Sequence, residues 1–521
     1  MKNPKVIIVG CGPVGAALAL DLGQRGVSCT VVESRTALAN IPKGQGLTQR
    51  SLEHFHFWGL VDELRAARIM PRGYPIGEIT AYGSLASEYW HAPAGREVVD
   101  DFFFQKNERL PQYRMEAVLR RQLASVPHVE LRLGVTATSV AQSAEGVRVT
   151  VANGRGDAET IEADYLVGCD GGNSIVREGV GVTRSGTDYE RTMVLLVFSS
   201  RDLHEKLKRF PERSTYRVMH PDLHGYWKFF GRVDVGEGFF FHTPVQANVS
   251  SRDVDAKAIL FDAAGFEFAF ELQHVGVWQL RNAVAASYRR GRIFIAGDAA
   301  HTHPPYGGYG LNNGLEDAVN LSWKLAARIS GWGGGNLLDT YSCEREPIFR
   351  EVAEDFIAAR IRQDDAFLTR YNPTRDRAEF EAAWNARETD VGSRRKAYEP
   401  HYEASPVVFG PPAGKTTAHG VHRVTARAGH HLAPQVLSSG RNVYEELGRD
   451  FTLLAFGPAG DDFERSARAH RVPLKIVRDM APAAPDRYGS SLILVRPDQH
   501  VAWAGETVTN ADAIIRKVTG Q

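Results

Sequence analysis

Short apolar runs that stop at a glycine or an acid recur along the chain. The first, "KVIIVG" at residues 5–10, leads into a segment of helical spacing at 16–25, and "SCTVVE" then ends at Glu33. Runs this short and this rich in β-branched residues predict buried strands, and the segment between them predicts a helix. The order strand, helix, strand predicts an α/β fold built on a parallel sheet.

The turn after the first strand reads "GCGPVG", a GxGxxG pattern. Gly10 permits the tight turn, Gly12 lets the backbone approach a pyrophosphate, and Gly15 allows close packing of helix on strand. Glu33 lies at the distance expected of an acid that binds ribose hydroxyls, and it would repel a 2′-phosphate. The pattern therefore predicts a dinucleotide site for the adenosine half of NAD or FAD, and disfavours NADP.

A second run, at residues 165–169, ends at Asp170 and Gly171, and Ser174 and Arg177 open the next helix. An acid and a glycine at a strand end suit a hydroxyl-rich ligand or a close backbone approach. Taken alone the signal is weak, because Asp-Gly most often marks a turn.

The third run, at residues 293–296, ends near Asp298 and is followed by a loop rich in proline and glycine. A long segment at helical spacing comes next. Asn313 is its expected N-cap, with Glu316 at capping-box spacing. The loop therefore leads directly into the N-terminus of a helix.

Two histidines in this loop, His301 and His303, alternate as metal ligands on a strand would. Pro304 and Pro305 interrupt that strand, and no third ligand lies nearby at helical spacing. We expect no metal site here, and structural or cofactor contacts instead.

Composition excludes several classes of function. The 521 residues are 43% hydrophobic, with 62 basic and 62 acidic side chains, so neither a nucleic acid nor an anionic membrane is an expected partner. The four cysteines form no CxxC pair, which favours a reducing, cytoplasmic location. The apolar N-terminus resembles a signal peptide, but its glycines fit the nucleotide turn better.

Together, "GCGPVG", "DGGNSIVR" and "GDAAHTHPPYGGYGLNNGLEDAVNLSWKLA" resemble the three fingerprints of class A flavoprotein monooxygenases, which share the para-hydroxybenzoate hydroxylase fold. The C-terminal order of strands resembles the thioredoxin-like domain of the phenol hydroxylase branch, which includes hydroxyphenylpropionate and polyketide hydroxylases. No cysteine follows Cys343, so this domain is not expected to perform thiol chemistry.

The resemblance implies an α/β fold with a Rossmann-like FAD-binding domain, an inserted β-sheet substrate domain and a thioredoxin-like domain. The implied segments are 1–185 for the first part of the FAD domain, 186–279 for the substrate domain, 280–399 for the return and a helical linker, and 400–521 for the thioredoxin-like domain.

The resemblance also implies the residues that contact FAD. Asp298 would bond the ribityl chain, and the amides at 308–312 would face the pyrimidine end of the flavin, where reduced flavin is anionic. The implied set comprises Gly10, Gly12, Pro13, Val14, Gly15, Glu33, Ser34, Arg35, Lys43, Gln112, Val135, Asp170, Arg177, Asp298, Gly308, Gly310, Leu311 and Asn312.

For the reaction itself, the resemblance places Pro304 and Pro305 beside the flavin ring. The segment 186–279 is rich in strand formers and predicts an aromatic-lined pocket. The polar side chains in it that could hold a phenolate are Tyr216, His220, Tyr226 and His242.

Three positions depart from the family pattern, which usually has Arg at Lys43, Gln at Tyr309 and Met at Leu311. Lys43 keeps the positive charge of the arginine but cannot donate its two parallel hydrogen bonds. Tyr309 and Leu311 lie where backbone contacts matter most, so these changes of side chain are expected to leave FAD binding intact.

The expected function is hydroxylation of a phenolic substrate with FAD, NADH or NADPH, and O₂, through a flavin hydroperoxide. Baeyer–Villiger insertion or epoxidation of a polyketide-like substrate, and a flavoprotein that does not oxygenate, remain alternatives. A homodimer is left open.

Overall fold

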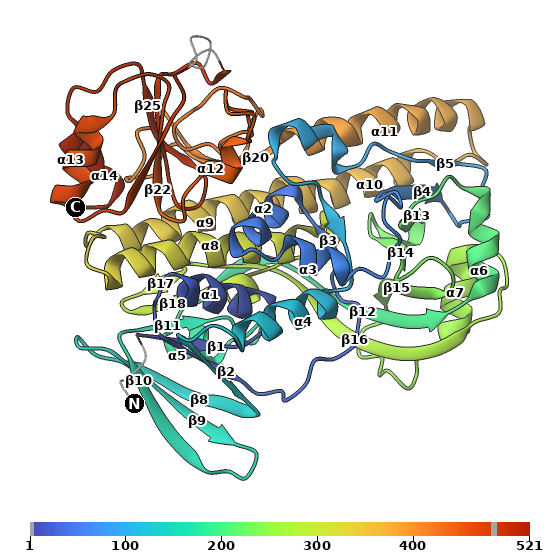
Figure 1. Cartoon of the computed structure of the whole chain (residues 1–521). Helices are drawn as coiled ribbons and strands as arrows, with labels where there is room; N and C mark the ends of the chain where they lie inside the picture. The colour runs from blue at the N-terminus through green and yellow to red at the C-terminus, as the bar shows by residue number, and fades with distance from the viewer. Residues whose placement is uncertain (1–4, 481–486) are drawn as a thin grey trace.

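The computed structural model describes residues 5–480 and 487–521, and its N-terminal domain is built on a six-stranded sheet (Figure 1). The strand order is β17-β18-β11-β1-β2-β7, and all neighbours are parallel except β17 and β18. Its strands are β1 (Val6–Val9), β2 (Cys29–Glu33), β7 (Val129–Leu133), β11 (Tyr165–Gly168), β17 (Arg289–Arg290) and β18 (Ile293–Ile295). The three apolar runs seen in the sequence are thus neighbours in one sheet, as expected.

Helices and two small sheets complete this domain. The helices α1 and α8 pack side by side, and α1 also contacts α4. A three-stranded antiparallel sheet, β10-β9-β8, projects near the N-terminus (Figure 1). The elements are α1 (Pro13–Gln24), α2 (Gln49–Trp58), α3 (Val61–Ala66), α4 (Gln112–Leu123), α5 (Ile175–Gly179), α8 (Tyr309–Ile329), β3 (Gly46–Leu47), β6 (Glu108–Arg109), β8 (Val135–Gln142), β9 (Val147–Asn153) and β10 (Ala158–Ala163).

The start of α8 corrects one expectation. Asn313 was the predicted N-cap, but the helix begins at Tyr309, with Gly308 as its N-cap. Gly307 and Gly308 adopt φ of 71° and 67°, so the chain turns into the helix earlier than the capping pattern indicates. Asn313 lies inside the helix, where its side chain donates to the Tyr309 carbonyl at 3.1 Å.

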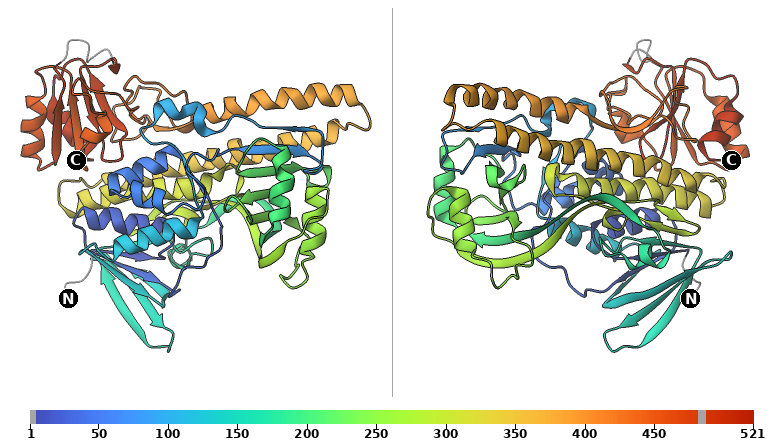
Figure 2. Two further views of the ribbon diagram at one scale, coloured as in Figure 1. Left: turned by 45° about the vertical axis from the view of Figure 1, so that its right-hand side comes forward. Right: turned by 180° about the vertical axis from the view of Figure 1, so that it is seen from behind.

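The second large sheet has eight strands in the order β19-β16-β12-β15-β14-β13-β4-β5. Its long strands β12 and β16 curve out of the N-terminal domain, as the view from behind in Figure 2 shows. Beyond segment 186–279, it includes two strands from residues 78–91. The strands are β4 (Glu78–Tyr82), β5 (Trp90–His91), β12 (Arg184–Ser199), β13 (Thr215–Met219), β14 (Trp227–Arg232), β15 (Gly238–Val245), β16 (Glu271–Ala285) and β19 (His301–Thr302).

The two faces of this sheet differ. On the outer face, α6 (Arg201–Lys206) and α7 (Ala256–Ala264) cover a core rich in phenylalanine. The inner face packs against α9 (Thr340–Glu351), the π-helical η7 (Val352–Ala358) and α10 (Ala359–Arg370). Because side chains alternate along a strand, Tyr216 enters the outer core while Arg217 points to the inner side.

A helical stretch leads from α8 to the last domain. It comprises α9 (Thr340–Glu351), η7 (Val352–Ala358), α10 (Ala359–Arg370) and α11 (Arg377–Ala397). Figure 1 shows α10 and α11 running along the top of the molecule. Among the described residues, no helix is both long enough and apolar enough to span a membrane.

The C-terminal domain has a four-stranded sheet in the order β23-β22-β24-β25, with β22 and β23 parallel and the other neighbours antiparallel. The helices α13 and α14 contact each other and share its apolar core. The elements are β20 (Tyr398–Tyr402), β21 (Thr416–His419), α12 (Val443–Glu446), β22 (Phe451–Ala455), α13 (Asp461–Ala469), β23 (Leu474–Arg478), β24 (Leu492–Val495), β25 (Val501–Gly505) and α14 (Ala511–Val518). The mixed α/β fold with a substrate sheet and a C-terminal domain is therefore confirmed.

Candidate flavin and substrate site

The three glycines of the first motif have different surroundings. Gly10 has a φ of 98°, and a Cβ there would lie 2.4 Å from the Cys169 carbonyl oxygen. A Cβ on Gly15 would lie 2.0 Å from the Gly10 oxygen, whereas one on Gly12 would meet no atom within 4 Å. Gly10 and Gly15 therefore permit close packing, and Gly12 leaves open space in which a ligand could approach the backbone.

Glu33 is fixed beside this turn by backbone amides. Its Oε2 accepts from the Cys11 amide at 2.8 Å, and its Oε1 accepts from the Arg35 amide at 2.9 Å. Burial alone would raise the Glu33 pKa, but these amides outweigh it and lower the pKa. The carboxylate is therefore held ionised, as an acceptor for ribose hydroxyls must be. The Ser34 hydroxyl lies 3.4 Å from Glu33 Oε1.

The first and third motifs meet at Val14. A Cβ on Gly297 would lie 2.8 Å from Val14 Cγ2, and one on Gly314 would lie 2.6 Å from it. The valine thus fills the space that two glycines leave. Val14 lies in the first turn of α1, which begins at Pro13, so this turn packs against the loop at Gly297 and the second turn of α8.

Polar side chains of the second motif form hydrogen bonds within their own loop. The Asp170 carboxylate accepts from the Ser174 hydroxyl at 2.5 Å and from the Val176 amide at 3.1 Å. Arg177 Nη1 donates to the Ala299 carbonyl at 3.0 Å, one residue beyond Asp298. Both side chains therefore position loops of the cofactor region, and direct contact of either with a cofactor stays a prediction.

Asp298 is the carboxylate best suited to receive a ligand hydroxyl. Its side chain is exposed, and it accepts no hydrogen bond from the part of the chain that is described. Although solvent reaches this carboxylate, the protein packed around it raises its pKa by desolvation, against the lowering effects of His301, Lys43 and Arg184. A carboxylate acceptor without a hydrogen-bond partner among the described residues fits the hydroxyl-rich ribityl chain of FAD.

Gln112 brings three segments together. A Cβ on Gly44 would lie 3.2 Å from Gln112 Oε1 and 3.6 Å from Leu311 Cδ2. The loop that carries Lys43, the start of α4 and the start of α8 therefore converge. Gln112 also donates to Glu116 at 2.7 Å.

The first turn of α8 presents backbone amides to a ligand. The Asn312 side chain is already used, since its Oδ1 accepts from the Thr48 amide at 2.9 Å and its Nδ2 donates to the Gly46 carbonyl at 3.0 Å. What remains available at Gly308, Gly310 and Leu311 are amides at a helix N-terminus, which favour negative charge. Just before this turn, Pro304 is buried and Pro305 exposed, and elsewhere Val135 packs half-buried against the N-terminal core.

The paired histidines take structural positions. His301 Nε2 lies 2.7 Å from Asp317 Oδ2, and its ring stacks on Phe349 at 3.6 Å between centroids. The same Asp317 oxygen accepts from the Gly297 amide at 3.0 Å. His303 stacks on Phe349 as well, and burial lowers its pKa to about 4.

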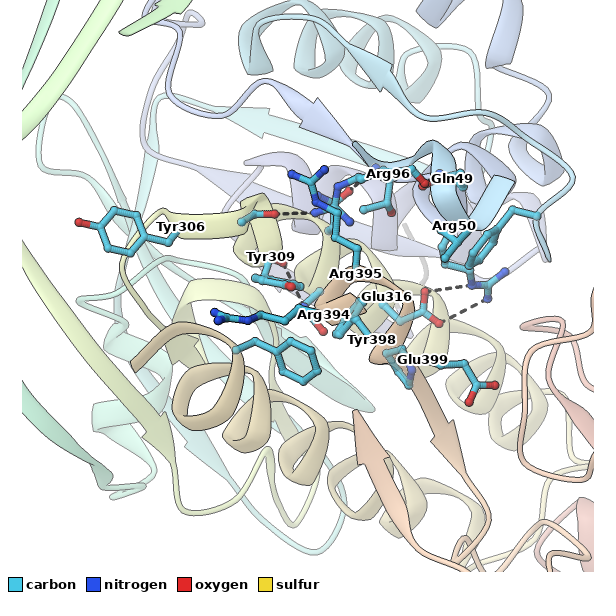
Figure 3. A pocket seen from close by; sticks show the side chains of 18 of the residues that line it. Gln49, Arg50, Arg96, Tyr306, Tyr309, Glu316, Arg394, Arg395, Tyr398 and Glu399 are labelled. Carbon is cyan, nitrogen blue, oxygen red and sulfur yellow. Dashed lines mark hydrogen bonds and ion pairs between the residues drawn. The ribbon is translucent and has the colours of Figure 1, made fainter. Parts of the chain in front are cut away.

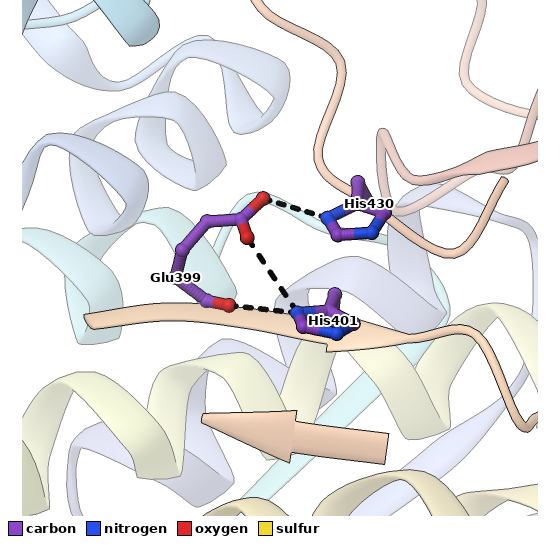
Figure 4. A group of neighbouring side chains, drawn as sticks. All are labelled: Glu399, His401 and His430. Carbon is purple, nitrogen blue, oxygen red and sulfur yellow. Dashed lines mark hydrogen bonds and ion pairs between the residues drawn. The ribbon is translucent and has the colours of Figure 1, made fainter. Parts of the chain in front are cut away.

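A second group of titratable side chains lies near β20 (Figure 4). Glu399, His401 and His430 have ligand atoms close enough to hold a metal ion. Their atoms already pair with one another. His430 Nδ1 lies 2.7 Å from Glu399 Oε1, and its Nε2 lies 2.9 Å from Glu403 Oε1. Arg427 also donates to Glu399 Oε1 at 3.0 Å, so the group is internally neutralised.

A cavity of about 190 Å³ lies between the start of α8, the large sheet, α11 and the C-terminal domain (Figure 3). Tyr306, Gly307 and Tyr309 line it on the side of α8. Tyr309 meets Tyr398 edge-on at 4.9 Å between ring centroids. The position that departs from the family pattern therefore forms part of the cavity wall.

None of the four polar side chains proposed for the substrate lines this cavity, within the residues described. The Tyr216 hydroxyl accepts from Arg232 Nη2 at 2.9 Å in the outer core, and His220 accepts from the Asp222 amide at 3.3 Å. Tyr226 and His242 are buried, packing on Tyr306 at 5.7 Å and on Phe229 at 4.9 Å between centroids. A substrate role for these four stays a prediction.

Sequence reasoning missed much of the opposite wall. Arg394, Arg395 and Tyr398 reach the cavity from the end of α11 and from β20, in a stretch interpreted as a linker. The signal in the sequence is the basic and aromatic run "SRRKAYEP". His422, His431 and His500 line the cavity from beyond residue 400.

Comparison with known proteins agrees with this arrangement. The pattern described as FAD binding domain matches residues 3–355, and that described as aromatic-ring hydroxylase, C-terminal, matches residues 425–521. A 4-methyl-5-nitrocatechol 5-monooxygenase of Burkholderia sp. is 31% identical over 96% of this chain and 93% of its own. A 3-(3-hydroxy-phenyl)propionate/3-hydroxycinnamic acid hydroxylase of Mycobacterium sp. (strain JLS) is 32% identical over 67% of this chain and 58% of its own.

Among solved structures, the flavin-dependent monooxygenase PieE in complex with FAD and substrate matches with a TM-score of 0.86 and 26% identity, covering 99% of both chains. The open space at Gly12 and the free acceptor at Asp298 fit the FAD that these families bind. The chain belongs to the family of FAD-dependent aromatic monooxygenases that carry an aromatic-ring hydroxylase C-terminal domain.

Proposed function

We propose that this monooxygenase hydroxylates the phenolic ring of its aromatic or polyketide-like substrate, consuming NADH or NADPH and O₂. The observation that carries the proposal is the place of the cavity. Tyr306, Gly307 and Tyr309 line it, and the same loop continues into α8, which contacts the turn that carries Asp298. An aromatic ring in the cavity would therefore share this loop with the cofactor.

The cavity walls suit a flat ring. Trp227, Tyr306, Tyr309, Phe356 and Tyr398 contribute aromatic surface, which favours stacked or edge-on contacts with an aromatic ligand. Burial raises the pKa of Tyr398 to about 12, and it also raises the pKa of Tyr309. Both hydroxyls therefore stay protonated at neutral pH and can donate a hydrogen bond to a phenolic oxygen.

Bound FAD would supply the redox chemistry, accepting a hydride from the nicotinamide and activating O₂ for transfer of one oxygen atom. The chain supplies position and environment. Its aromatic walls exclude water from the reacting ring, and the amides at Gly310 and Leu311 stabilise negative charge at the start of α8.

The names of two relatives support a phenolic substrate. One is a monooxygenase of a nitrocatechol and the other a hydroxylase of a hydroxyphenyl acid, so both act on rings with a hydroxyl group. A phenol is electron-rich at the ortho and para carbons, where an electrophilic oxygen adds most readily.

The test is a panel of phenols, each paired with its methyl ether, offered to the FAD-loaded enzyme with NADH or NADPH. We expect the phenol of at least one pair to accelerate nicotinamide oxidation and to yield a ring-hydroxylated product. An ester or an epoxide as the product would instead support the Baeyer–Villiger or epoxidising alternative. Nicotinamide oxidation that no phenol accelerates would contradict the proposal.

A further inference from the structure

The cavity wall is rich in arginine. Among the described residues, three carboxylates line the same space, those of Glu78, Glu316 and Glu399. The arginines that line it are Arg50, Arg96, Arg217, Arg345, Arg360, Arg394 and Arg395.

Four of these arginines have carboxylate partners that hold the fold. Arg345 Nε lies 2.8 Å from Asp317, and Arg50 Nε lies 3.2 Å from Glu316. Arg217 and Arg360 both pair with Asp364, which Arg387 also contacts. Since each of the four is already held by a carboxylate of the fold, we do not assign them to a ligand.

Arg96 and Arg395 are different. Arg96 Nη2 donates to the Gly307 carbonyl at 2.5 Å, and Arg395 Nη1 donates to the Ala94 carbonyl. Among the described residues, neither guanidinium forms an ion pair with a carboxylate. Each therefore brings a positive charge to the cavity without an ion-pair partner, and each keeps further N–H donors for a ligand.

The two charges lie close enough to act on each other. The Arg395 pKa is lowered, first by burial and further by Arg96 and Arg360, while Glu78 and Glu97 oppose the shift. Mutual repulsion of partly buried cations favours an anion between them. In Figure 3 both side chains reach the same part of the wall, near Tyr309.

The position also fits a ring substrate. The Arg96 guanidinium lies 5.8 Å from the centre of the Tyr309 ring, which itself lines the cavity. An anionic group bound by Arg96 would therefore project from a ring held among the aromatic walls.

We infer that Arg96 and Arg395 bind a carboxylate of the substrate, so that the enzyme acts on aromatic acids. This inference rests on the proposed function, because it assumes that the cavity receives the substrate. A planar guanidinium matches a carboxylate with two parallel hydrogen bonds, which makes arginine suited to the task.

The experiment measures binding without turnover. The FAD-loaded protein is titrated, with no nicotinamide present, with 3-hydroxybenzoate, 3-(3-hydroxyphenyl)propanoate and 3-hydroxycinnamate and with the primary amide of each. Binding is followed calorimetrically. At least one acid should bind about 10-fold or more tightly than its amide, since a hydrogen bond to a charged group contributes about 1.5–3 kcal/mol.

The variants Arg96→Gln and Arg395→Gln should each weaken binding of that acid about 10-fold or more and leave binding of its amide unchanged. Arg395→Lys should keep part of the preference for the acid over its amide, because lysine carries the positive charge but lacks the planar guanidinium that donates two parallel hydrogen bonds. Lys396→Gln, which removes an exposed charge next to Arg395 on α11, is the matched control and should change neither affinity.

Equal binding of acids and amides, equal weakening of both by the glutamine variants, or no binding of any acid would overturn the inference. So would a loss of NADPH affinity in these variants while acid binding stays intact, because the arginines would then serve the nicotinamide. A preference for acids without phenol-stimulated nicotinamide oxidation would instead keep the inference and count against hydroxylation.

Discussion

Arg496 donates from both terminal nitrogens to the Glu344 carboxylate, at 2.7 and 2.8 Å, and both side chains are fully buried. Glu344 belongs to α9, and Arg496 follows β24 in the C-terminal domain. Lys324 of α8 donates to the same carboxylate at 2.7 Å. The C-terminal domain is therefore joined to the helices that carry the flavin loop by a buried charge network.

Removing one charge from this network should be strongly destabilising. Glu344→Gln leaves Arg496 and Lys324 buried with less compensation, and breaking a buried ion pair in this way costs about 3–5 kcal/mol. Thermal and chemical unfolding measure the change. Glu464→Gln, which removes a carboxylate from an exposed pair with Arg468, is the control and should leave stability nearly unchanged. Equal effects of the two variants would contradict this view of the network.

Stability should also fall in acid. Burial alone would raise the pKa of Glu344 and Glu316, but Arg496 and Arg50 respectively outweigh it, so both pKa values are lowered in the fold. Groups with lowered pKa stabilise the fold above their unfolded pKa of about 4.3 and lose that contribution as the pH falls toward their folded pKa. Unfolding free energies measured down a pH series should decline below about 4.3, with a smaller slope in Glu344→Gln. An unfolding free energy that does not change as the pH falls through this range would contradict the prediction.

Replacing two glycines of the first motif with alanine should affect different properties, stability in one case and FAD affinity in the other. Gly15→Ala places a Cβ 2.0 Å from the Gly10 oxygen and should lower stability, since such overpacking costs about 1–3 kcal/mol. Gly12→Ala meets no atom within 4 Å, so the melting temperature of the apoprotein should not change. FAD affinity should nevertheless drop about 10-fold or more, because the methyl group occupies the approach of the pyrophosphate. Normal FAD affinity in Gly12→Ala would place the pyrophosphate elsewhere.

Asp298→Ala should weaken FAD retention. Loss of a hydrogen bond to a charged acceptor corresponds to about 1.5–3 kcal/mol, or roughly 10- to 100-fold in affinity. Flavin released on dialysis and the dissociation constant from fluorescence titration both report the change. Asp62→Ala, at an exposed site on α3, serves as the control. If the two variants retain FAD equally well, Asp298 does not bind the ribityl chain.

Tyr216 gives a test of the substrate assignments. Its hydroxyl accepts from Arg232 in the outer core, so Tyr216→Phe should lower stability by about 1 kcal/mol and leave the KM for a phenol unchanged. A raised KM at unchanged stability would mean that Tyr216 contacts the substrate after all.

Motifs that combine local geometry with a fixed spacing could be predicted from the sequence. The GxGxxG turn needs only Gly10, Gly12 and Gly15 in a strand–turn–helix context, and the helix begins at Pro13, near its expected start. The acids Asp170 and Asp298 follow buried parallel strands that are neighbours in the sheet, so their place at the same edge of the sheet also followed from topology.

Features that depend on distant packing could not be predicted. The direction of Tyr216 depends on which face of β13 the helices cover, and alternation alone does not decide between Tyr216 and Arg217. The start of α8 depends on the positive φ of Gly307 and Gly308. The arginines of α11 join the cavity only because that helix folds back along α10.

The most direct test of the account is the ratio of oxygenated product to nicotinamide oxidised, measured with isotope-labelled O₂ and the FAD-loaded enzyme across the phenolic panel. For the preferred phenol, we expect one labelled oxygen in the ring of each product molecule and close to one product per NADH or NADPH. Nicotinamide oxidation that yields only hydrogen peroxide with every phenol, or product whose new oxygen comes from water, would contradict it.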